Sequence, residues 1–151
     1  MISVAREEDL PELLGLMRAY CDFYEVAPSD ASLLAMSRAL IANPEHDGLQ
    51  LIARAQDGSI VGFATLVWTL STLDAAREGV MNDLFVVPSA RGQRIGEQLI
   101  AACLERCRER GAASLGWQTA HTNERAQRLY DRVGAKREEW VDYSLKADQE
   151  A

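Results

Sequence analysis

The sequence predicts a mixed α/β fold in which a mostly antiparallel sheet of six or seven strands is flanked by about four helices. Asp57-Gly58, which lies between two apolar runs, is a strong signal for an antiparallel hairpin. Residues 80–119 have the pattern of a strand, an amphipathic helix and a second strand, which is typical of a crossover between parallel strands. Glu7–Tyr24 carries apolar residues at helical spacing. Together these patterns predict helices packed on a mixed sheet.

Local signals set the expected bounds of the elements in the N-terminal half. Ser29 or Asp30 is placed to cap a helix, because a short polar side chain there accepts a hydrogen bond from a free backbone N–H group. The predicted elements are strand Ile2–Ala5, helix Glu7–Tyr24, a second helix to about Ala42, and strands Leu49–Ala55 and Ile60–Leu70.

Glycines and one asparagine punctuate the C-terminal half. Gly111 and Gly134 each follow a helical pattern and are placed to end it, and Asn123 is placed to cap the last helix. The helix before Gly111 is expected to turn Leu99, Ile100, Cys103, Leu104 and Cys107 inward. The predicted elements are strand Val80–Val87, helix Ile95–Arg110, strand Ser114–Thr119, a helix from Asn123 to Val133, and one or two strands within Lys136–Leu145.

Length and charge limit the class of protein. The 151 residues fit one domain, expected over residues 1–146, followed by a polar tail at 147–151. The net charge of −7 argues against broad binding to nucleic acid or an anionic membrane, and it is compatible with a cationic substrate. The N-terminus has no apolar signal core, and no apolar run approaches the roughly 20 residues that a membrane span needs. A cytoplasmic protein is therefore expected.

The cysteines predict neither a disulfide framework nor a metal site. There are three of them, Cys21, Cys103 and Cys107, and no Cys-x-x-Cys pair. Cys103 and Cys107 lie four residues apart on one helix face, where small buried side chains are expected. No histidine is suitably spaced to complete a zinc site. No metal is expected.

Arg91–Gly96 is the first segment that points to chemistry. It joins a strand to an amphipathic helix, and a helix N-terminus offers free N–H groups and a positive dipole to an anion. Gly92 and Gly96 allow the backbone to approach phosphate oxygens closely, while Arg91 and Arg94 add positive charge. The segment lacks the pattern of a P-loop or of a dinucleotide-binding fingerprint. An ordinary helix start with two solvated arginines is the alternative.

The strand before this loop offers a place for an extended ligand. Pro88 ends the ladder of the strand because proline has no N–H group. Backbone groups of Leu84–Val86, just before it, are then available to an amide-bearing chain that adds like a strand.

A second segment, Asn123–Ala135, supports the first. On a helix, Asn123, Ala126 and Tyr130 lie near one face. The small side chain of Ala126 permits close approach of a ligand chain, and the Tyr130 hydroxyl is able to donate a proton to a departing thiolate. A half-buried core tyrosine is the alternative for Tyr130.

The two segments together resemble the GNAT superfamily of N-acetyltransferases. Its loop pattern, Q/R-x-x-G-x-G/A after a strand that ends near a proline, is matched by Arg91-Gly-Gln-Arg-Ile-Gly96, except that Arg94 replaces the first glycine. Its second pattern, Asn-x-x-Ala-x-x-Leu-Tyr-x-x-x-Gly-Ala/Phe, is matched throughout Asn123–Ala135. The predicted order of strands and helices also fits, so the resemblance covers essentially the whole chain. It implies the GNAT fold with a splayed strand at the cofactor site.

The resemblance implies acetyl-CoA as co-substrate and assigns its contacts. Tyr130 is implied as the general acid toward the coenzyme A sulfur. The backbone of Leu84, Phe85 and Val86 is expected to hold the acetyl and pantetheine amides and to stabilise an oxyanion. A homodimer is also implied, because the region around Trp140 often pairs two subunits in the family. The remaining expected contacts are Arg91, Gly92, Gln93, Arg94, Ile95, Gly96 and Glu97 at the pyrophosphate, and Asn123 and Ala126 at the pantetheine arm.

The general base is left open, with Asp83 as the first candidate. Asn82-Asp83-Leu84-Phe85-Val86 resembles a stretch of the spermidine/spermine acetyltransferases that has glutamate where Asn82 stands. Adjacent strand residues face opposite ways, so Asn82 and Asp83 both face the substrate only if a bulge intervenes. Tyr24 and Glu25 end the first helix and are candidates to line the acceptor pocket, with Asp83. The other candidate bases are Glu25, Asp22, His121 and a water chain.

The expected activity is transfer of an acetyl group from acetyl-CoA to a primary amine of a small molecule, by direct attack. A polyamine, an amino acid or analogue and an amino-bearing antibiotic are the acceptor classes considered. The alternatives are acetylation of protein N-termini or lysines, and a non-catalytic sensor of acyl-CoA. Tyr130 favours catalysis over the sensor, because a sensor has no need of a general acid.

Overall fold

The computed structural model describes residues 1–148 of the chain and divides the chain into two compact units, Met1–Gln118 and Thr119–Ala151. The predicted single domain over residues 1–146 stays a prediction. Residues 149–151 of the predicted polar tail lie outside the described residues. Among residues 1–148, no helix is both long and apolar enough to span a membrane.

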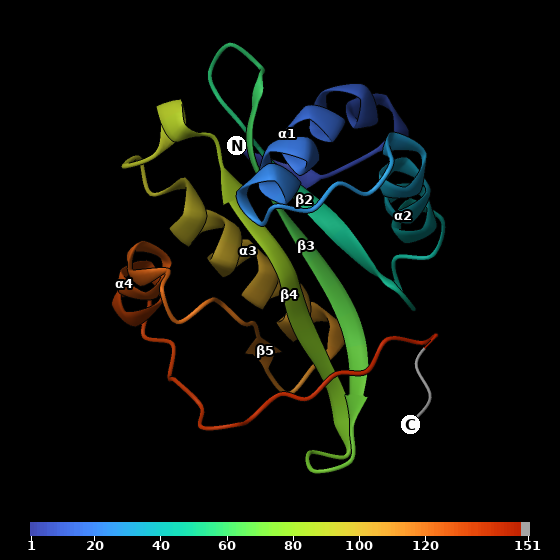
Figure 1. The fold of residues 1–151 in the computed structure, drawn as a ribbon, viewed down its shortest axis with the longest axis vertical. Helices are drawn as coiled ribbons and strands as arrows, with labels where there is room; N and C mark the ends of the chain where they lie inside the picture. Colours follow the sequence, from blue (N-terminus) through green and yellow to red (C-terminus); the bar gives the residue numbers. More distant parts are fainter. Residues whose placement is uncertain (149–151) are drawn as a thin grey trace. The chain divides into compact units, whose positions relative to one another are not determined.

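The first unit is built on one sheet with helices on both of its faces (Figure 1). Its elements are β1 (Ile2–Val4), η1 (Glu7–Asp9), α1 (Leu10–Phe23), α2 (Asp30–Ala42), β2 (Gly48–Arg54), β3 (Ile60–Ser71), β4 (Ala76–Val86), η2 (Pro88–Ala90), α3 (Ile95–Arg110) and β5 (Leu115–Gly116). The five strands lie in the order β1-β2-β3-β4-β5. The pairs from β1 to β4 are antiparallel, and β4 pairs parallel with β5 across α3. The predicted mixed, mostly antiparallel sheet is confirmed.

Several helix ends follow the local signals of the sequence. The Ser29 hydroxyl caps α2 by accepting a hydrogen bond from Ser32 N at 3.1 Å. Gly111 ends α3 in the left-handed region, with φ of 74°, where a residue without Cβ is least strained. Both ends agree with the prediction.

Successive side chains of β3 point alternately toward the helices on the two faces of the sheet. A Cβ added to Gly62 would meet the Leu99 side chain of α3 at 3.3 Å. The next residue, Phe63, packs instead into the buried cluster with α1. Because successive strand residues point to opposite faces, α1 and α3 lie on opposite sides of the sheet, as Figure 1 shows.

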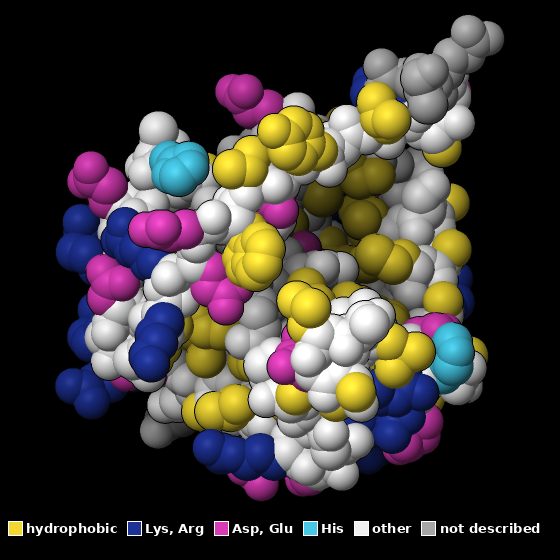
Figure 2. Space-filling model, turned by 90° about the horizontal axis from the view of Figure 1, so that it is seen from below, with side chains coloured by type: hydrophobic (Ala, Val, Ile, Leu, Met, Phe, Trp, Pro, Cys, Tyr) yellow, Lys and Arg dark blue, Asp and Glu magenta, His cyan; other side chains and the backbone are white. Residues whose placement is uncertain are grey.

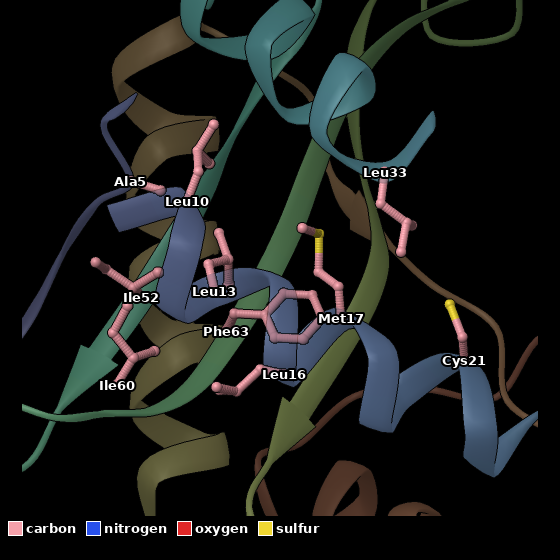
Figure 3. Close-up of a cluster of buried hydrophobic side chains, with 10 residues drawn as sticks. All are labelled: Ala5, Leu10, Leu13, Leu16, Met17, Cys21, Leu33, Ile52, Ile60 and Phe63. Atoms are coloured by element: carbon pink, nitrogen blue, oxygen red, sulfur yellow. The ribbon is translucent and has the colours of Figure 1, made fainter. Parts of the chain in front are cut away.

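The layer between α1 and the sheet is the main apolar core. Its side chains come from α1, α2, β2 and β3 and converge on Phe63, which is 1% exposed (Figure 3). Burial of this apolar surface is the dominant force that holds α1 against the sheet. The cluster comprises Ala5, Leu10, Leu13, Leu16, Met17, Cys21, Leu33, Ile52, Ile60 and Phe63.

Helix α3 packs closely on the other face of the sheet. Leu99, Ile100, Cys103 and Cys107 are buried, whereas Leu104 is 37% exposed, so its predicted inward position is wrong. A Cβ on Gly79 would lie 2.4 Å from Cys107 Sγ, so only glycine permits this approach. All three cysteines are free, and the two on α3 are buried as predicted.

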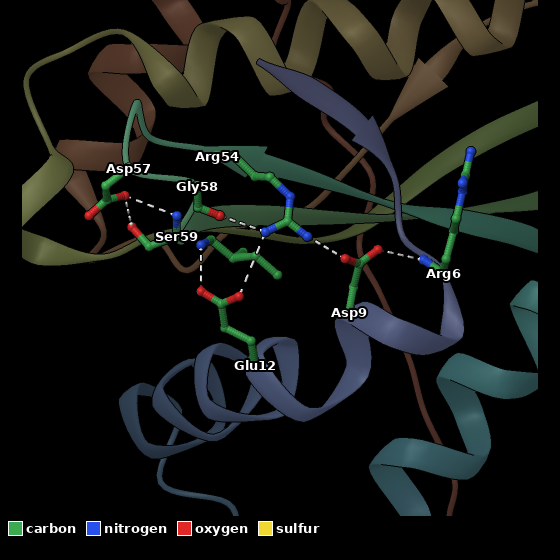
Figure 4. A network of polar contacts seen from close by, with 8 residues as sticks. Arg6, Asp9, Glu12, Arg54, Asp57, Gly58 and Ser59 are labelled. Carbon is green, nitrogen blue, oxygen red and sulfur yellow. Dashed lines mark hydrogen bonds and ion pairs between the residues drawn. The ribbon is translucent and has the colours of Figure 1, made fainter.

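A polar network ties the start of α1 to the β2–β3 hairpin (Figure 4). Arg54 pairs with Asp9 and donates from Nη1 to the Gly58 carbonyl oxygen at 2.6 Å. Asp9 also accepts from the Arg6 backbone N–H at 2.8 Å. Glu12 accepts from Ile60 N at 2.7 Å and lies 3.7 Å from Arg54. This network fixes the angle at which α1 leaves the hairpin end of the sheet.

The second unit contains one helix, α4 (Glu124–Arg132). Asn123 caps it, because its Oδ1 accepts from Ala126 N at 3.2 Å. Gly134 follows the helix with φ of 84°. Both residues therefore have the structural roles that the sequence predicts.

The strand predicted within Lys136–Leu145 is wrong. Residues 135–146 contain no helix or strand, so residues 1–148 hold five strands rather than six or seven. Trp140 and Tyr143 are 74% and 92% exposed. The alternation of apolar residues is present, but a strand also needs a neighbour for its backbone hydrogen bonds, and the described residues provide none. The homodimer expected through this region stays a prediction.

Two other bounds also differ from the prediction. β4 begins at Ala76, four residues before the expected Val80, because it continues the hairpin with β3. β5 is only Leu115–Gly116 instead of Ser114–Thr119. The short β5 leaves most of β4 without a neighbour on that side, and this edge is the basis of the candidate site.

Candidate active site

A β-bulge at Asn82 is the feature that shapes the site. Thr65 of β3 pairs with Asp83 and Leu66 pairs with Met81, so Asn82 is an extra residue in β4. A bulge of this kind shifts the alternation of side chains by one residue. Before it, Gly79 faces α3. After it, Phe85 faces Tyr20 of α1, with ring centroids 6.4 Å apart. Without the extra residue, Asp83 would face α3.

The bulge also changes which backbone groups face the open edge of β4. Val87 N donates to Val61 O at 2.9 Å, which is the bond of a paired position in an antiparallel ladder. Paired and unpaired positions alternate, so Phe85 and Asp83 bond to β3, while the N–H and C=O groups of Leu84 and Val86 point away from it. β5 pairs with β4 only at Gly79 and Val80. Leu84 and Val86 therefore face the splayed side of the sheet.

Asp83 is a half-buried carboxylate held by neutral donors. Thr65 of β3 lies opposite it in the register, and the hydroxyl of Tyr20 from α1 is the second uncharged group that acts on its pKa. Burial raises the pKa of the Asp83 carboxyl above its usual value, and the hydrogen bonds from Thr65 and Tyr20 lower it in part. Burial and the neighbouring Asp83 carboxylate raise the pKa of Tyr20, so its hydroxyl keeps its proton. A carboxylate with a raised pKa is a better proton acceptor at neutral pH than a solvated one.

Aromatic rings surround this carboxylate on the α1 side. The Tyr20 ring lies 5.0 Å from that of Tyr24 and 6.0 Å from that of Phe63, measured between centroids. The Tyr20 hydroxyl also donates to the Asn82 carbonyl oxygen at 3.3 Å, which ties α1 to the bulge. The sequence reasoning missed Tyr20. Its place one turn before Tyr24, on the same helix face, was the signal that would have found it.

The end of α1 brings only part of the predicted acceptor pocket to Asp83. Tyr24 is 42% exposed and contacts Tyr20, which in turn bonds to Asp83. Asp22 and Glu25 lie next to it in the sequence and are exposed. Glu25 has a φ of 56°, a left-handed conformation that ends the helix. Tyr24 therefore lies beside Tyr20, and the roles of Tyr24 and Glu25 in an acceptor pocket stay predictions.

The predicted anion loop has the geometry of an open helix start. The first intrahelical bond of α3 runs from Gln98 N to Arg94 O at 3.1 Å. The N–H groups of Ile95 and Gly96 come before it, at positions that have no acceptor within the helix. A Cβ on Gly92 would meet nothing within 4 Å, so this turn is open to a ligand. Gln93 is exposed between Gly92 and Arg94.

The two arginines of the loop have different roles. Arg94 adopts φ of 61° and ψ of 20°, the left-handed region in which the family pattern has glycine. Its side chain makes no capping bond. Arg91 reaches back to the strand, where its Nε donates to the Val86 carbonyl oxygen at 3.0 Å and its guanidinium lies 6.0 Å from the centre of the Phe85 ring. Arg91 thus joins the loop to the open edge of β4.

The other predicted site residues lie in the second unit. Ala126 and Tyr130 are half-buried on α4, one turn apart, and Asn123 caps the same helix. His121 is exposed before the helix, and its carbonyl oxygen accepts from Gln127 Nε2 at 2.9 Å. The predicted common face of Asn123, Ala126 and Tyr130 is compatible with this helix. Their contacts with a ligand stay predictions.

Charges of both signs cover the surface. Figure 2 shows basic side chains interspersed with acidic ones on the face that it presents. Within residues 1–148, no group of three or more His, Cys, Asp or Glu side chains is arranged to hold a metal ion.

Comparison with known proteins agrees with this geometry. Residues 13–135 match the Acetyltransferase (GNAT) family. An uncharacterized N-acetyltransferase, YhfO, of Bacillus subtilis (strain 168) is 33% identical over 145 residues, which are 95% of this chain and 95% of that protein. An aminoalkylphosphonate N-acetyltransferase of Salmonella typhimurium is 28% identical over 144 residues, 90% of this chain and 94% of that protein.

A solved structure gives the same result for the fold. AAC(6')-Iy, in complex with the bisubstrate analog CoA-S-monomethyl-acetylneamine, superimposes with a TM-score of 0.83 at 25% identity, and covers 97% of each chain. The match of the family over most of the chain and the shared fold lead to one conclusion. This chain belongs to the GNAT family of acetyltransferases.

Proposed function

We propose that this chain transfers the acetyl group of acetyl-CoA to a primary amine of a small molecule by direct attack of the amine on the thioester. The observation that carries the proposal is the bulge at Asn82, which turns Asp83 toward α1 and turns the backbone of Leu84 and Val86 toward the open edge of β4. This arrangement supports the proposal, because a carboxylate suited to accept a proton and backbone amides suited to bind a ligand then lie on adjacent residues of one strand.

The residues of the first unit fit acetyl-CoA. The open N–H groups at the start of α3 and the unobstructed turn at Gly92 suit a pyrophosphate. The outward backbone of Leu84 and Val86 suits the amides of a pantetheine arm, which adds to β4 like a strand. An N–H group of this edge is also a donor for the thioester carbonyl as negative charge develops on its oxygen.

The proposed reaction balances as follows. The amine nitrogen forms a bond to the thioester carbonyl carbon, and Asp83 accepts the proton of the amine directly or through water. The C–S bond then breaks, and the thiolate of coenzyme A takes a proton from the Tyr130 hydroxyl. The products are the N-acetylated amine and coenzyme A.

A small acceptor is favoured by the relatives and by the site. The Salmonella relative is named for a small amine, and the AAC(6')-Iy complex contains a small-molecule bisubstrate analog. In this chain, Tyr20 and Tyr24 bring aromatic surface beside the Asp83 carboxylate, a combination that attracts a cationic amine. A cytoplasmic location and a homodimer stay predictions.

A thiol-release assay with acetyl-CoA and a panel of amines tests the proposal. The panel holds polyamines, amino acids, amino-bearing antibiotics, and peptides with a free N-terminus or a lysine. Turnover of a small amine supports the proposal. Turnover of peptides alone would identify a protein acetyltransferase, and tight binding of acetyl-CoA without turnover of any amine would identify a sensor.

Tyr130→Phe tests the general acid separately. Loss of the phenolic proton is expected to lower turnover by about 100-fold while acetyl-CoA affinity changes little. Tyr143→Phe, which removes a hydroxyl from a side chain 92% exposed, is the matched control. An unchanged rate for Tyr130→Phe would remove this residue from the acid role.

A further inference from the structure

Three polar side chains lie inside the apolar layer beneath the candidate active site. Ser37 of α2, Gln50 of β2 and Thr65 of β3 are 0%, 3% and 1% exposed. A polar group in such a place is unfavourable unless it is hydrogen-bonded. Their partners therefore indicate what these residues do.

The three residues form a line of hydrogen bonds through the Met17 sulfur, and this line ends at Thr65, directly opposite Asp83. Gln50 Nε2 donates to Thr65 Oγ1 at 3.1 Å and lies 3.6 Å from Met17 Sδ. Ser37 Oγ donates to the same sulfur at 3.6 Å. Thr65 lies directly opposite Asp83 in the β3–β4 register, and its hydroxyl lowers the pKa of that carboxyl. The line crosses the layer from α2 to the site.

Chemistry fixes the direction of the last two bonds. An ionised carboxylate only accepts hydrogen bonds, so the Thr65 hydroxyl, which lies opposite Asp83, has its single proton to offer to that carboxylate. Thr65 Oγ1 then has only lone pairs to offer, and Gln50 must present its NH₂ group rather than its carbonyl oxygen. Gln50 Nε2 faces Thr65 in the structure, as this argument requires.

We propose that Gln50 and Thr65 are positioning residues that hold the Asp83 carboxylate in a single orientation, ready to accept the proton of the acceptor amine. This inference rests on the role proposed for Asp83. Gln50 acts through Thr65. Its NH₂ group donates to the Thr65 hydroxyl oxygen, and the hydroxyl proton is therefore left to point toward Asp83. Neither residue touches the amine.

The surroundings of Asp83 explain why the Thr65 hydroxyl affects the pKa of this carboxyl. The groups that face it are Thr65 from β3 and Tyr20 from α1, with Tyr24 behind Tyr20. Burial raises the pKa of the Asp83 carboxyl, and Thr65 is the first of the two hydrogen-bond donors that oppose this rise. Removal of the Thr65 hydroxyl is expected to raise the pKa further and to free the carboxylate to rotate.

The experiment compares four proteins: the wild type, Thr65→Val, Thr65→Ser and Thr69→Val. Valine has the shape of threonine without the hydroxyl, serine keeps the hydroxyl, and Thr69 is an exposed residue of the same strand. The carboxyl carbon of Asp83 is titrated by carbon-13 NMR without substrate, and kcat/KM is measured against pH with the best amine.

Thr65→Val is expected to raise the apparent pKa of the Asp83 carboxyl and the acidic limb of kcat/KM together, by about one pH unit, the size of one hydrogen bond to a charged group. Thr65→Ser and Thr69→Val are expected to stay near the wild type. Equal titration of Asp83 in the wild type and Thr65→Val would overturn the inference, because a merely structural threonine leaves that carboxyl unaffected.

A double variant guards against misfolding. Thr65→Val leaves the Gln50 NH₂ group buried with one partner fewer, so Gln50→Met is added to make both positions apolar. The double variant is expected to show the same rise in the Asp83 titration, and an unchanged titration would also overturn the inference.

Asp83→Asn separates this inference from the proposed function. If Asp83→Asn keeps full turnover while Thr65→Val still shifts the NMR titration, the positioning stands and Asp83 is not the base. If Asp83→Asn loses turnover and Thr65→Val leaves the titration unchanged, the base stands and the positioning by Gln50 and Thr65 is wrong.

Discussion

Asp9 and Asp83 are two carboxylates that lie against α1, and they differ in what faces them. Asp9 pairs with the guanidinium of Arg54 and accepts from the Arg6 backbone. Among residues 1–148, the side chains that act on the pKa of Asp83 are uncharged, the hydroxyls of Thr65 and Tyr20. A fixed cation stabilises the ionised form of a carboxylate permanently, whereas neutral donors leave its proton affinity high. The first carboxylate therefore serves structure, and the second is suited to move a proton.

The largest effect is expected for Asp83→Asn, which keeps the shape of the side chain and removes its basicity. Turnover is expected to fall by about 100-fold or more, because general base catalysis contributes on that scale. Initial rates with saturating acetyl-CoA measure this loss. Asp9→Asn is the matched comparison, and it is expected to keep most of the activity. Equal activity of the two variants would break the contrast between the two carboxylates.

The next largest effect is on the free energy of unfolding. Here Asp9→Asn, which keeps most of the activity, is expected to cost more than Asp83→Asn. Asp9→Asn leaves the Arg54 guanidinium, 25% exposed, with only the distant Glu12 carboxylate. A loss of about 2 kcal/mol in the free energy of unfolding is expected, less than for a fully buried pair. Chemical denaturation measures it. Glu109→Gln, which breaks an exposed pair with Arg106, is the control and should change stability by less than about 0.5 kcal/mol.

A smaller effect is the pH dependence of stability at Asp83. Its folded pKa is raised by burial, so its contribution to stability is fully present below the unfolded pKa and is lost as pH rises through the folded pKa. Asp83→Asn is therefore expected to have a higher Tm than the wild type at pH 7, and this gain should shrink toward pH 4. Asp74→Asn, on an exposed turn, is the control. A wild type that is more stable at every pH would contradict the proposed cause.

The smallest effect is expected for Tyr20→Phe. The phenol is half-buried, so water is able to replace part of its bond to Asp83. The acidic limb of kcat/KM should rise by less than it does in Thr65→Val, because the Tyr20 bond opposes the raised pKa less than the Thr65 bond does. A larger shift than that of Thr65→Val would make Tyr20, rather than Thr65, the main partner of the carboxylate.

Local features of the fold were predictable because they depend on residues close in sequence. The hairpin at Asp57-Gly58, the Ser29 cap and the Gly111 helix end each involve a few neighbouring positions. The crossover from β4 through α3 to β5 was predictable for the same reason, because a strand pattern, a helix pattern and a second strand pattern follow one another in the sequence. The last strand failed because strand formation depends on a partner elsewhere in the chain, which local alternation does not reveal.

The sequence by itself determined the loop and helix start at Arg91–Gly96, the cap at Asn123 and the choice of Asp83 as first candidate base, because each rests on a short pattern of residues. Only the tertiary structure decided what surrounds Asp83. The bulge at Asn82 turns this carboxylate to the α1 face, where Tyr20 and Thr65 act on its pKa and Gln50 donates to Thr65 from a third element. The proton affinity of a carboxylate depends on burial and on neighbours within a few ångströms, and neighbours so far apart in sequence meet only after folding.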